Sequence, residues 1–298
     1  MNNKNLDKLI TKALAIEAQE AKEAGRLGFM ARVLVQATMP HSNPGNVQAW
    51  GRENGAFSMV MKPGFIKQNN EFESIGLPYG AYPRLLLAWL TTEAVRTKSP
   101  TLTLGDSLSG FMHEIGLLPT GGRWGTIGRL KEQMRRLFAA SIGCTYSEKL
   151  AGEVAREAGL NFSVATAYDL WWHPQHAEQA ALWQSTVTLS QEFFNEVVSK
   201  PVPVDMGALK ILKQSPLKLD IYCWLTYRMS YLKKPTLVPW EALQAQFGAN
   251  FGRTIDFKIK FLNHLKAVML VYPEAKLEAV DGGLLLKPSR PHVKRLTD

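Results

Sequence analysis

The chain of 298 residues is 46% hydrophobic and 20% charged, a composition typical of a globular protein and not of a disordered one. This length suffices for one large domain or for two domains of about 150 residues each. Lys and Arg number 35 against 26 Asp and Glu, so the formal net charge is +9, which favours a polyanionic partner such as nucleic acid or an anionic membrane. The two cysteines argue against a disulfide framework, and no apolar run approaches the roughly 18 residues of a membrane span.

The positive charge is concentrated in three short windows. Residues 121–136 hold five basic and one acidic residue, and residues 251–266 and 287–298 each hold four basic and one acidic residue. The three windows carry net charges of +4, +3 and +3, so the rest of the chain carries −1. The excess therefore marks particular segments and is not a general property of the surface.

The first predicted element is a charged helix over residues 6–23, which has no apolar signal-peptide core. We treat residues 1–25 as an N-terminal extension and expect a cytoplasmic protein. The Pro, Gly and Asn content of residues 40–46 predicts a loop, and the alternation of residues 56–62 predicts a strand. Pro83 then starts a long apolar helix, because proline suits the first turn.

From this helix onward the sequence repeats itself. Trp89-Leu90-Thr91 returns as Trp224-Leu225-Thr226, and Pro100-Thr101-Leu102 returns at the same separation as Pro235-Thr236-Leu237. Further matches follow at slightly smaller separations, as short deletions in loops would produce; they join Phe111, Ile115 and Gly116 to Leu243, Phe247 and Gly248, and Ile127, Met134 and Leu137 to Ile255, Leu262 and Leu265.

Each copy shows the same predicted order of elements. A long apolar helix leads to an extended Pro-Thr-Leu piece, a short helix ending in Gly, a basic helix and two strand-like runs. In the first copy the runs are 141–146 and 161–172. In the second copy they are 267–273 and 284–288, with the hairpin signal Asp281-Gly282 between them.

Two helices followed by a basic helix and a β-hairpin are the elements of a winged helix-turn-helix. We therefore expect an α+β, mostly helical protein made of two tandem winged-helix domains. The first would span residues 26–190, and the second would span residues 191–298 and include a basic C-terminal tail.

The basic helix of the first copy begins after a glycine-rich stretch at residues 120–125. The glycine spacing fits neither GxGxxG nor GxxxxGK[ST], which argues against a phosphate-binding loop of either type. On a helical wheel the apolar residues share one face and Arg129 and Arg136 lie on the opposite one. In a helix-turn-helix the N-terminal part of the second helix enters the major groove, and glycines there let the backbone approach a phosphate.

An ordinary Arg-rich surface helix is the alternative for one copy alone. The second copy repeats the pattern, however, because Arg253, Asp256, Lys260, Asn263 and His264 share one face on the wheel. We therefore expect two DNA-reading helices. The residues expected to contact DNA are Gly122, Arg123, Trp124, Thr126, Arg129 and Arg136 in the first copy, and Arg253, Thr254, Lys260 and Asn263 in the second.

Support for catalysis is absent from the sequence. His173 and His176 lack the further ligands that a metal site needs, and His113-Glu114 lacks the second His of HExxH. We find no carboxylate constellation for nucleotidyl transfer. The expected protein is therefore not an enzyme and uses no metal or cofactor.

Several long blocks resemble the plasmid-encoded RepA family of replication initiators. They include GLPYGAYPRLLLAWLTTEAVRTKSPTLTLGDSLSGFM, PTGGRWGTIGRLKEQMRRLFAAS and PVPVDMGALKILKQSPLKLDIYCWLTYRMSYL, and the resemblance covers residues 27–293. It implies a protein that binds repeated double-stranded origin sequences (iterons), helps to open the duplex, and recruits host DnaA and the replicative helicase. It also implies a homodimer that represses its own gene, and a tail whose Arg290, Lys294 and Arg295 touch the DNA backbone.

Two other functions compete with this one. A transcriptional repressor would use the same DNA-binding core without initiating replication. A helicase- or primase-associated enzyme would show ATPase or primer-synthesis activity. The DNA beside the gene distinguishes an initiator from a repressor, because tandem repeats of about twenty base pairs indicate an initiator and a single palindrome indicates a repressor.

Overall fold

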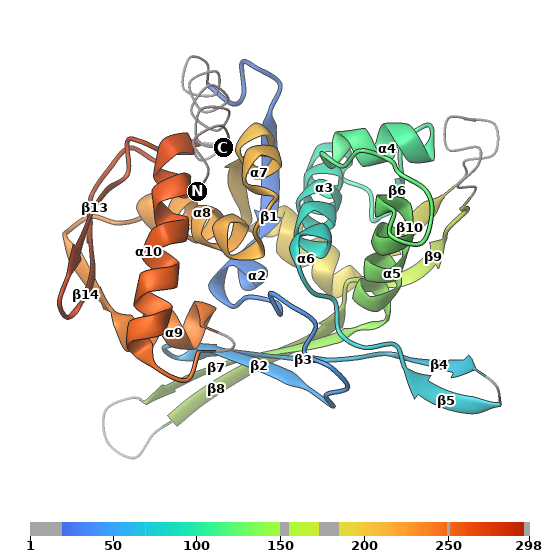
Figure 1. Cartoon of the computed structure of the whole chain (residues 1–298), viewed down its shortest axis with the longest axis horizontal. Coiled ribbons are helices and arrows are strands. Elements are labelled where there is room, and N and C mark those ends of the chain that lie inside the picture. The colour runs from blue at the N-terminus through green and yellow to red at the C-terminus, as the bar shows by residue number, and fades with distance from the viewer. Residues whose placement is uncertain (1–19, 69, 150–154, 173–184, 249–250, 295–298) are drawn as a thin grey trace. The chain divides into compact units, whose positions relative to one another are not determined.

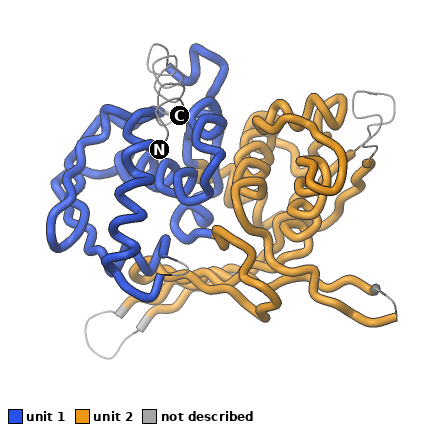
Figure 2. Tube along the Cα trace, in the orientation of Figure 1, with its two compact units in different colours: residues 1–38, 202–298 blue, residues 39–201 orange. Residues whose placement is uncertain are grey.

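The computed structural model describes residues 20–68, 70–149, 155–172, 185–248 and 251–294. The chain divides into two units (Figure 2). We call residues 39–201 the central unit, and residues 1–38 with 202–298 the terminal unit. Residues 26–38, which the sequence analysis assigned to the first domain, thus group with the C-terminal part of the chain. The reason is that β1 (Leu27–Ala31) pairs with β11 (Pro201–Asp205).

Helices and a three-stranded sheet form the core of the central unit (Figure 1). The sheet has the order β6-β10-β9, and both pairings are antiparallel. The elements are α3 (Ala81–Thr97), β6 (Thr101–Thr103), α4 (Leu108–Glu114), α5 (Thr126–Ala139), β9 (Ala165–Asp169), β10 (Thr186–Leu189) and α6 (Gln191–Ser199).

A second, four-stranded antiparallel sheet of order β2-β3-β7-β8 also belongs to the central unit. Its strands are β2 (Trp50–Asn54), β3 (Phe57–Lys62), β7 (Ser141–Lys149) and β8 (Ala155–Ser163), and a separate hairpin is formed by β4 (Phe65–Gln68) and β5 (Glu71–Ser74).

This second sheet corrects the hairpin expected for the first copy. The run 141–146 lies in β7, which pairs with β3 as well as β8. The run 161–172 is split, because Val164 separates the end of β8 from β9. The sheet beside α5 instead uses β9 with β10, a strand the sequence analysis did not predict.

The terminal unit contains β1, α2 (Arg32–Gln36), β11, α7 (Met206–Leu212), α8 (Pro216–Met229), β12 (Thr236–Pro239), α9 (Trp240–Phe247), α10 (Thr254–Val271), β13 (Lys276–Val280) and β14 (Gly283–Lys287). Its sheet has the order β12-β14-β13, again antiparallel. Asp281-Gly282 forms the predicted two-residue connection, since Val280 pairs with Gly283.

The strand expected at residues 267–273 is wrong. Those residues continue α10 to Val271, because Leu265, Val268 and Val271 extend its buried stripe at helical spacing. The real hairpin partner of β14 is β13, in which Leu277 and Val280 are half-buried and the other residues are exposed. Apolar runs this short fit a buried helix as well as a strand.

The internal repeat is confirmed at the level of elements. Helices α3 and α8, and strands β6 and β12, start at the same separation along the chain as the repeated Trp-Leu-Thr and Pro-Thr-Leu segments. Trp89 and Trp224 are both buried, and each packs edge-on against a phenylalanine of the following short helix region, Phe111 and Phe247. The two units therefore share one arrangement of helix, strand, two helices and two strands, interrupted in the central unit by β7 and β8 of the four-stranded sheet.

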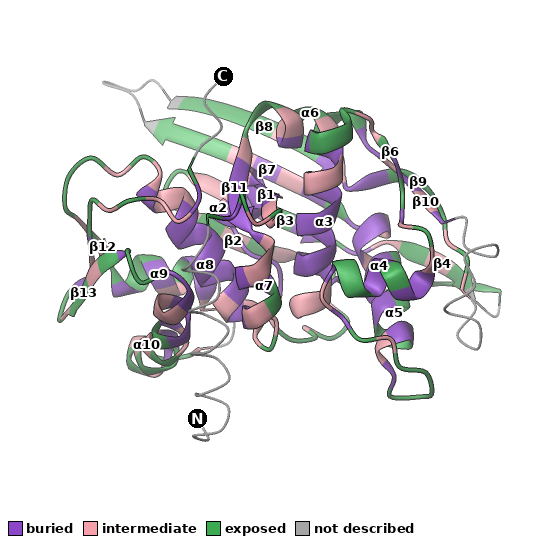
Figure 3. Ribbon diagram, turned by 90° about the horizontal axis from the view of Figure 1, so that it is seen from above, coloured by how far each residue is buried: buried purple, intermediate pink, exposed green. Residues whose placement is uncertain are grey.

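The centre of each unit is a helix with buried residues on all sides. Helix α3 buries eleven of its residues and α8 buries ten, as the colouring of α3 in Figure 3 makes visible. Strands contribute heavily beside the helices, so the described residues form a mixed α/β protein and "mostly helical" overstates the helical share.

A buried polar network ties the C-terminal segment to the terminal unit. Asp205 accepts hydrogen bonds from the backbone N–H of Gly207 and Ala208 at the start of α7, and pairs with Arg26 at 3.1 Å. The N–H of Asp205 donates to the hydroxyl of Tyr222, which lies 2.7 Å from Nδ1 of His292. Burial lowers the pKa of His292 to about 4, so its ring is neutral at neutral pH.

Candidate nucleic-acid interface

The loop between α4 and α5 is closed at its base by two threonines. Thr120 Oγ1 accepts from the N–H of Thr126 at 3.0 Å, and Thr126 Oγ1 accepts from the N–H of Thr120 at 2.9 Å. The Thr126 hydroxyl also donates to the carbonyl of Leu118 at 2.5 Å. Thr126 was expected to contact DNA, but its hydroxyl makes hydrogen bonds that hold the loop in place.

Arg123 and Trp124 stand at the tip of this closed loop. The indole of Trp124 is 80% exposed, which is rare for so large an aromatic side chain, and the Arg123 guanidinium lies 5.2 Å from the ring centroid. Gly122 adopts φ +78°, a left-handed conformation that favours glycine. The structure thus presents two of the expected contact residues to solvent on a loop with a fixed base.

Gly125 closes the turn into α5, and we expect Gly125→Ala to destabilise the central unit by about 1–3 kcal/mol. A Cβ here would lie 2.2 Å from the carbonyl oxygen of Thr120 and 2.3 Å from that of Gly121, and both are backbone atoms. Equilibrium urea unfolding would measure the change. The matched control is Gly128→Ala, in the first turn of α5 with nothing within 4 Å of the added Cβ, which should be neutral or stabilising. Equal effects of the two substitutions would contradict the clash.

The predicted two faces of α5 are largely confirmed. Ile127, Leu130, Met134, Leu137 and Phe138 are all buried, and Arg129, Lys131 and Arg135 are exposed. Arg129 folds back on the loop, because its Nη2 donates to the Trp124 carbonyl at 3.2 Å. Lys131 and Arg135 are exposed as well, although they were not among the residues expected to contact DNA.

Arg136 does not project outward as the wheel predicted. Its side chain is 15% exposed, Nη1 donates to the carbonyl of Leu77 at 3.2 Å, and Nη2 bonds Glu132 at 2.6 Å. The guanidinium also lies over the Tyr79 ring. Residues distant in sequence thus enclose the C-terminal half of α5, which a wheel drawn from one helix cannot anticipate.

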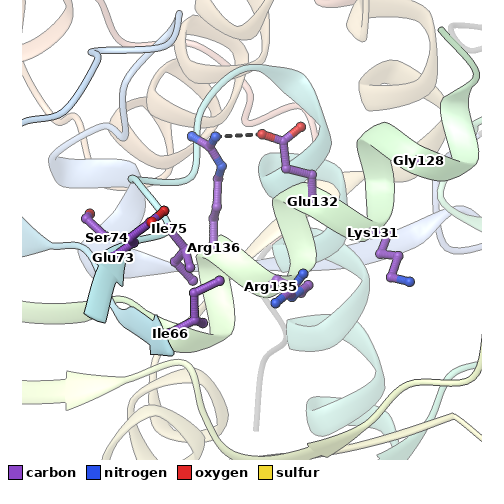
Figure 4. Close-up of a pocket in the computed structure, with 9 residues that line it drawn as sticks. All are labelled: Ile66, Glu73, Ser74, Ile75, Gly128, Lys131, Glu132, Arg135 and Arg136. Carbon is purple, nitrogen blue, oxygen red and sulfur yellow. Dashed lines mark hydrogen bonds and ion pairs between the residues drawn. The ribbon is translucent and has the colours of Figure 1, made fainter. Parts of the chain in front are cut away.

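A hollow of about 350 Å³ lies between α5 and the β4–β5 hairpin (Figure 4). Lys131, Glu132, Arg135 and Arg136 line it from the helix, and Glu73 lines it from β5. Because acidic and basic groups face the same space, the hollow does not favour an anion strongly.

The first turn of α10 is held by its own side chains. Arg253 makes two hydrogen bonds to Asp256, at 2.8 and 2.9 Å, and this pairing lowers the pKa of Asp256. Thr254 Oγ1 donates to Gln244 at 2.6 Å, so Thr254, like Thr126, braces the helix start. The Arg253 side chain is still 75% exposed.

The outward face of α10 differs from the one drawn from the sequence. Lys260 and Asn263 are exposed, as expected, but Phe257, Ala267 and Val271 are buried close to the predicted face. The exposed row runs instead through Ile255, Ile259, Asn263 and Lys266.

The sequence analysis missed three members of that row because it aligned Ile255 with the buried Ile127. Burial matches the two helices better when this alignment is shifted by a single position. Leu130 then corresponds to Phe257 and Met134 to Phe261, and all four side chains are buried. Ile255 and Ile259 fall on the solvent side, opposite the phenylalanines.

In the C-terminal tail, Arg290 and Lys294 are exposed but paired. Both contact the carboxylate of Glu20, and Arg290 also contacts that of Glu274. Such solvent-exposed pairs contribute little to stability, so a phosphate can replace them at little cost. Arg295, His173 and His176 lie outside the described residues.

Within the described ranges, no group of three His, Cys, Asp or Glu side chains is placed to hold a metal ion. No helix among the described residues is both long and apolar enough to cross a membrane.

Comparison with known proteins gives both a family and a fold. Residues 77–241, more than half of the chain, match the family model described as "Plasmid encoded RepA protein". No curated protein matches the chain.

The solved structures of domains 2 and 3 of RctB are similar in fold. One gives a TM-score of 0.52 at 11% identity and covers 88% of this chain and 99% of that one. Another gives a TM-score of 0.50 at 12% identity and covers 86% and 96%.

Proposed function

The chain belongs to the plasmid-encoded RepA family of replication initiators, and from that premise we propose that it binds iterons in the replication origin of its plasmid and helps to open the duplex there. This activity is one of recognition and not of catalysis. Recruitment of host DnaA and the replicative helicase, and a homodimer that represses its own gene, complete the proposal.

The shared order of elements supports two winged-helix domains. In the terminal unit the order is α8, β12, α9, α10, β13 and β14, with sheet order β12-β14-β13. In the central unit it is α3, β6, α4, α5, β9 and β10, with sheet order β6-β10-β9. In a helix-turn-helix the second helix of the pair reads the major groove, which assigns α5 and α10 as the recognition helices.

The observation that carries the proposal is that both recognition helices combine a buried apolar face with solvent-exposed cations. Arg123, Arg129 and Lys131 are exposed on or before α5, and Arg253 and Lys260 are exposed on or before α10. Cations at these places would bind phosphates and set the position of each helix, and side chains deeper in the groove would read the bases. Helix N-termini add a favourable partial charge for phosphate.

Selection from a random-sequence duplex library by the full chain tests the binding step directly. We expect one sequence to be enriched and bound with a Kd that rises steeply with salt, by about a hundredfold or more between 50 and 200 mM. Fluorescence anisotropy at several salt concentrations would measure the slope. Absence of any enriched sequence, or a Kd independent of salt, would overturn the proposal.

A plasmid replication assay in cells distinguishes an initiator from a repressor. A plasmid carrying only the origin repeats should replicate when this protein is supplied from a second replicon, and should be lost without it. If the enriched sequence is a single palindrome at the promoter and the plasmid is lost in both cases, the repressor is the correct assignment. ATPase or primer-synthesis activity in the purified protein would favour the enzyme alternative.

A further inference from the structure

Two isoleucines on α10 are exposed to solvent. Ile255 is 59% exposed and Ile259 is 58% exposed, whereas the phenylalanines between and after them, Phe257 and Phe261, are fully buried. Residues four apart lie next to each other on one helix face, so the two side chains form a continuous apolar strip. The exposed Asn263 continues the same row by one further turn.

The shared fold does not require this strip. In the alignment that matches the burial of the two helices, Ile255 and Ile259 correspond to Gly128 and Glu132 of α5. A glycine and a glutamate at these places leave the fold of the central unit intact. Packing within the unit therefore does not account for the two isoleucines, which leaves contact with a partner as their role.

The charge around the strip indicates that its partner is an anion and not an apolar protein surface. Between residues 251 and 266 the chain holds four basic and one acidic residue, and Arg253, Lys260 and Lys266 are exposed there. An apolar protein groove would supply these cations with no anionic group from outside, whereas the phosphates on both sides of a major groove would bind them.

The apolar group that the major groove offers is the C5-methyl of thymine. We propose that Ile255 and Ile259 recognise thymine methyl groups, and that Asn263 on the same row bonds the edge of a neighbouring adenine, so that α10 selects an A·T-rich half-site. This inference rests on the proposed function, because it assigns the base-reading residues of a helix already proposed to enter DNA.

The test uses the duplex selected by the full chain, made once with thymine and once with uracil, which lacks only the methyl group. We expect uracil to weaken binding of the unchanged protein by about three- to fivefold for each methyl lost. In the variant Ile255→Ala with Ile259→Ala, the thymine duplex should already bind weakly, and the change to uracil should have no further effect. Fluorescence anisotropy gives all four values.

The matched control is Leu237→Ala, which removes another exposed apolar side chain from the same unit and should retain the full preference for thymine. Equal affinity of the unchanged protein for thymine and uracil duplexes would overturn the inference while leaving the proposed function standing. A preference for thymine that persists in the double variant would also overturn it. Failure to select any duplex would instead contradict the proposed function.

Discussion

Replacing Arg253 and Lys260 together by alanine is expected to weaken DNA binding by about a hundredfold at low salt. Both side chains are exposed, one just before α10 and one on it, and loss of a cation that contacts a phosphate weakens binding by roughly tenfold at low salt. If both contact phosphates, the slope of log K against log salt should also decrease by about two. Anisotropy titrations between 50 and 200 mM salt would measure both quantities.

The pair Lys233→Ala and Lys234→Ala serves as the control, because it removes the same charge from exposed positions after α8. It should change affinity only slightly. Circular dichroism of both variants should match the unchanged protein, since none of the four side chains is buried. Equal losses in the two variants would show that total charge, and not the position of α10, determines binding.

Replacing Asp205 by alanine is expected to lower the free energy of unfolding by about 3–5 kcal/mol. The carboxylate is 1% exposed and bonds two backbone N–H groups at the start of α7 as well as Arg26. Its removal would leave these donors without their acceptor and would remove the ion pair between Arg26 and the end of β11. Urea unfolding followed by tryptophan fluorescence would measure the loss.

Asp205→Asn separates the two roles of this carboxylate. The amide oxygen can still accept from the N–H groups of α7, but the charge that pairs with Arg26 is gone. We expect a loss smaller than that of the alanine variant. An alanine variant as stable as the unchanged protein would mean that the network around Asp205 contributes little to folding.

The parts of the fold that were predictable are those governed by local pattern. The Pro83 region, the Asp281-Gly282 turn and the repeated Trp-Leu-Thr and Pro-Thr-Leu segments all mark elements that the structure contains. Strand pairing was harder, because β9 joins β10 across residues that carry no hairpin signal. In the first copy β7 and β8 are inserted between α5 and the strand pair β9–β10, and they join β2 and β3 in the four-stranded sheet instead of forming the expected hairpin.

The apolar and basic faces of the two candidate helices were predictable in outline, but the contacts of individual side chains were not. Charge and wheel identified both helices, yet Thr126 and Thr254 proved to brace the chain and Arg136 to be enclosed by Leu77, Tyr79 and Glu132. The threonines bond residues that precede their helices, and Arg136 contacts residues 77 and 79, so a wheel drawn for one helix includes none of these partners. The exposed isoleucines were hidden by an alignment slightly out of register, which only burial reveals.

The pairing of β1 with β11 has a consequence for how the protein is made. Residues 27–31 leave the ribosome long before residues 201–205, so the first strand must wait while the whole of residues 39–201 is synthesised. Because domains fold as units during synthesis, the interposed segment can complete its own core first. A released fragment of residues 1–200 should therefore contain a folded central unit and a first strand, β1, that still lacks its partner.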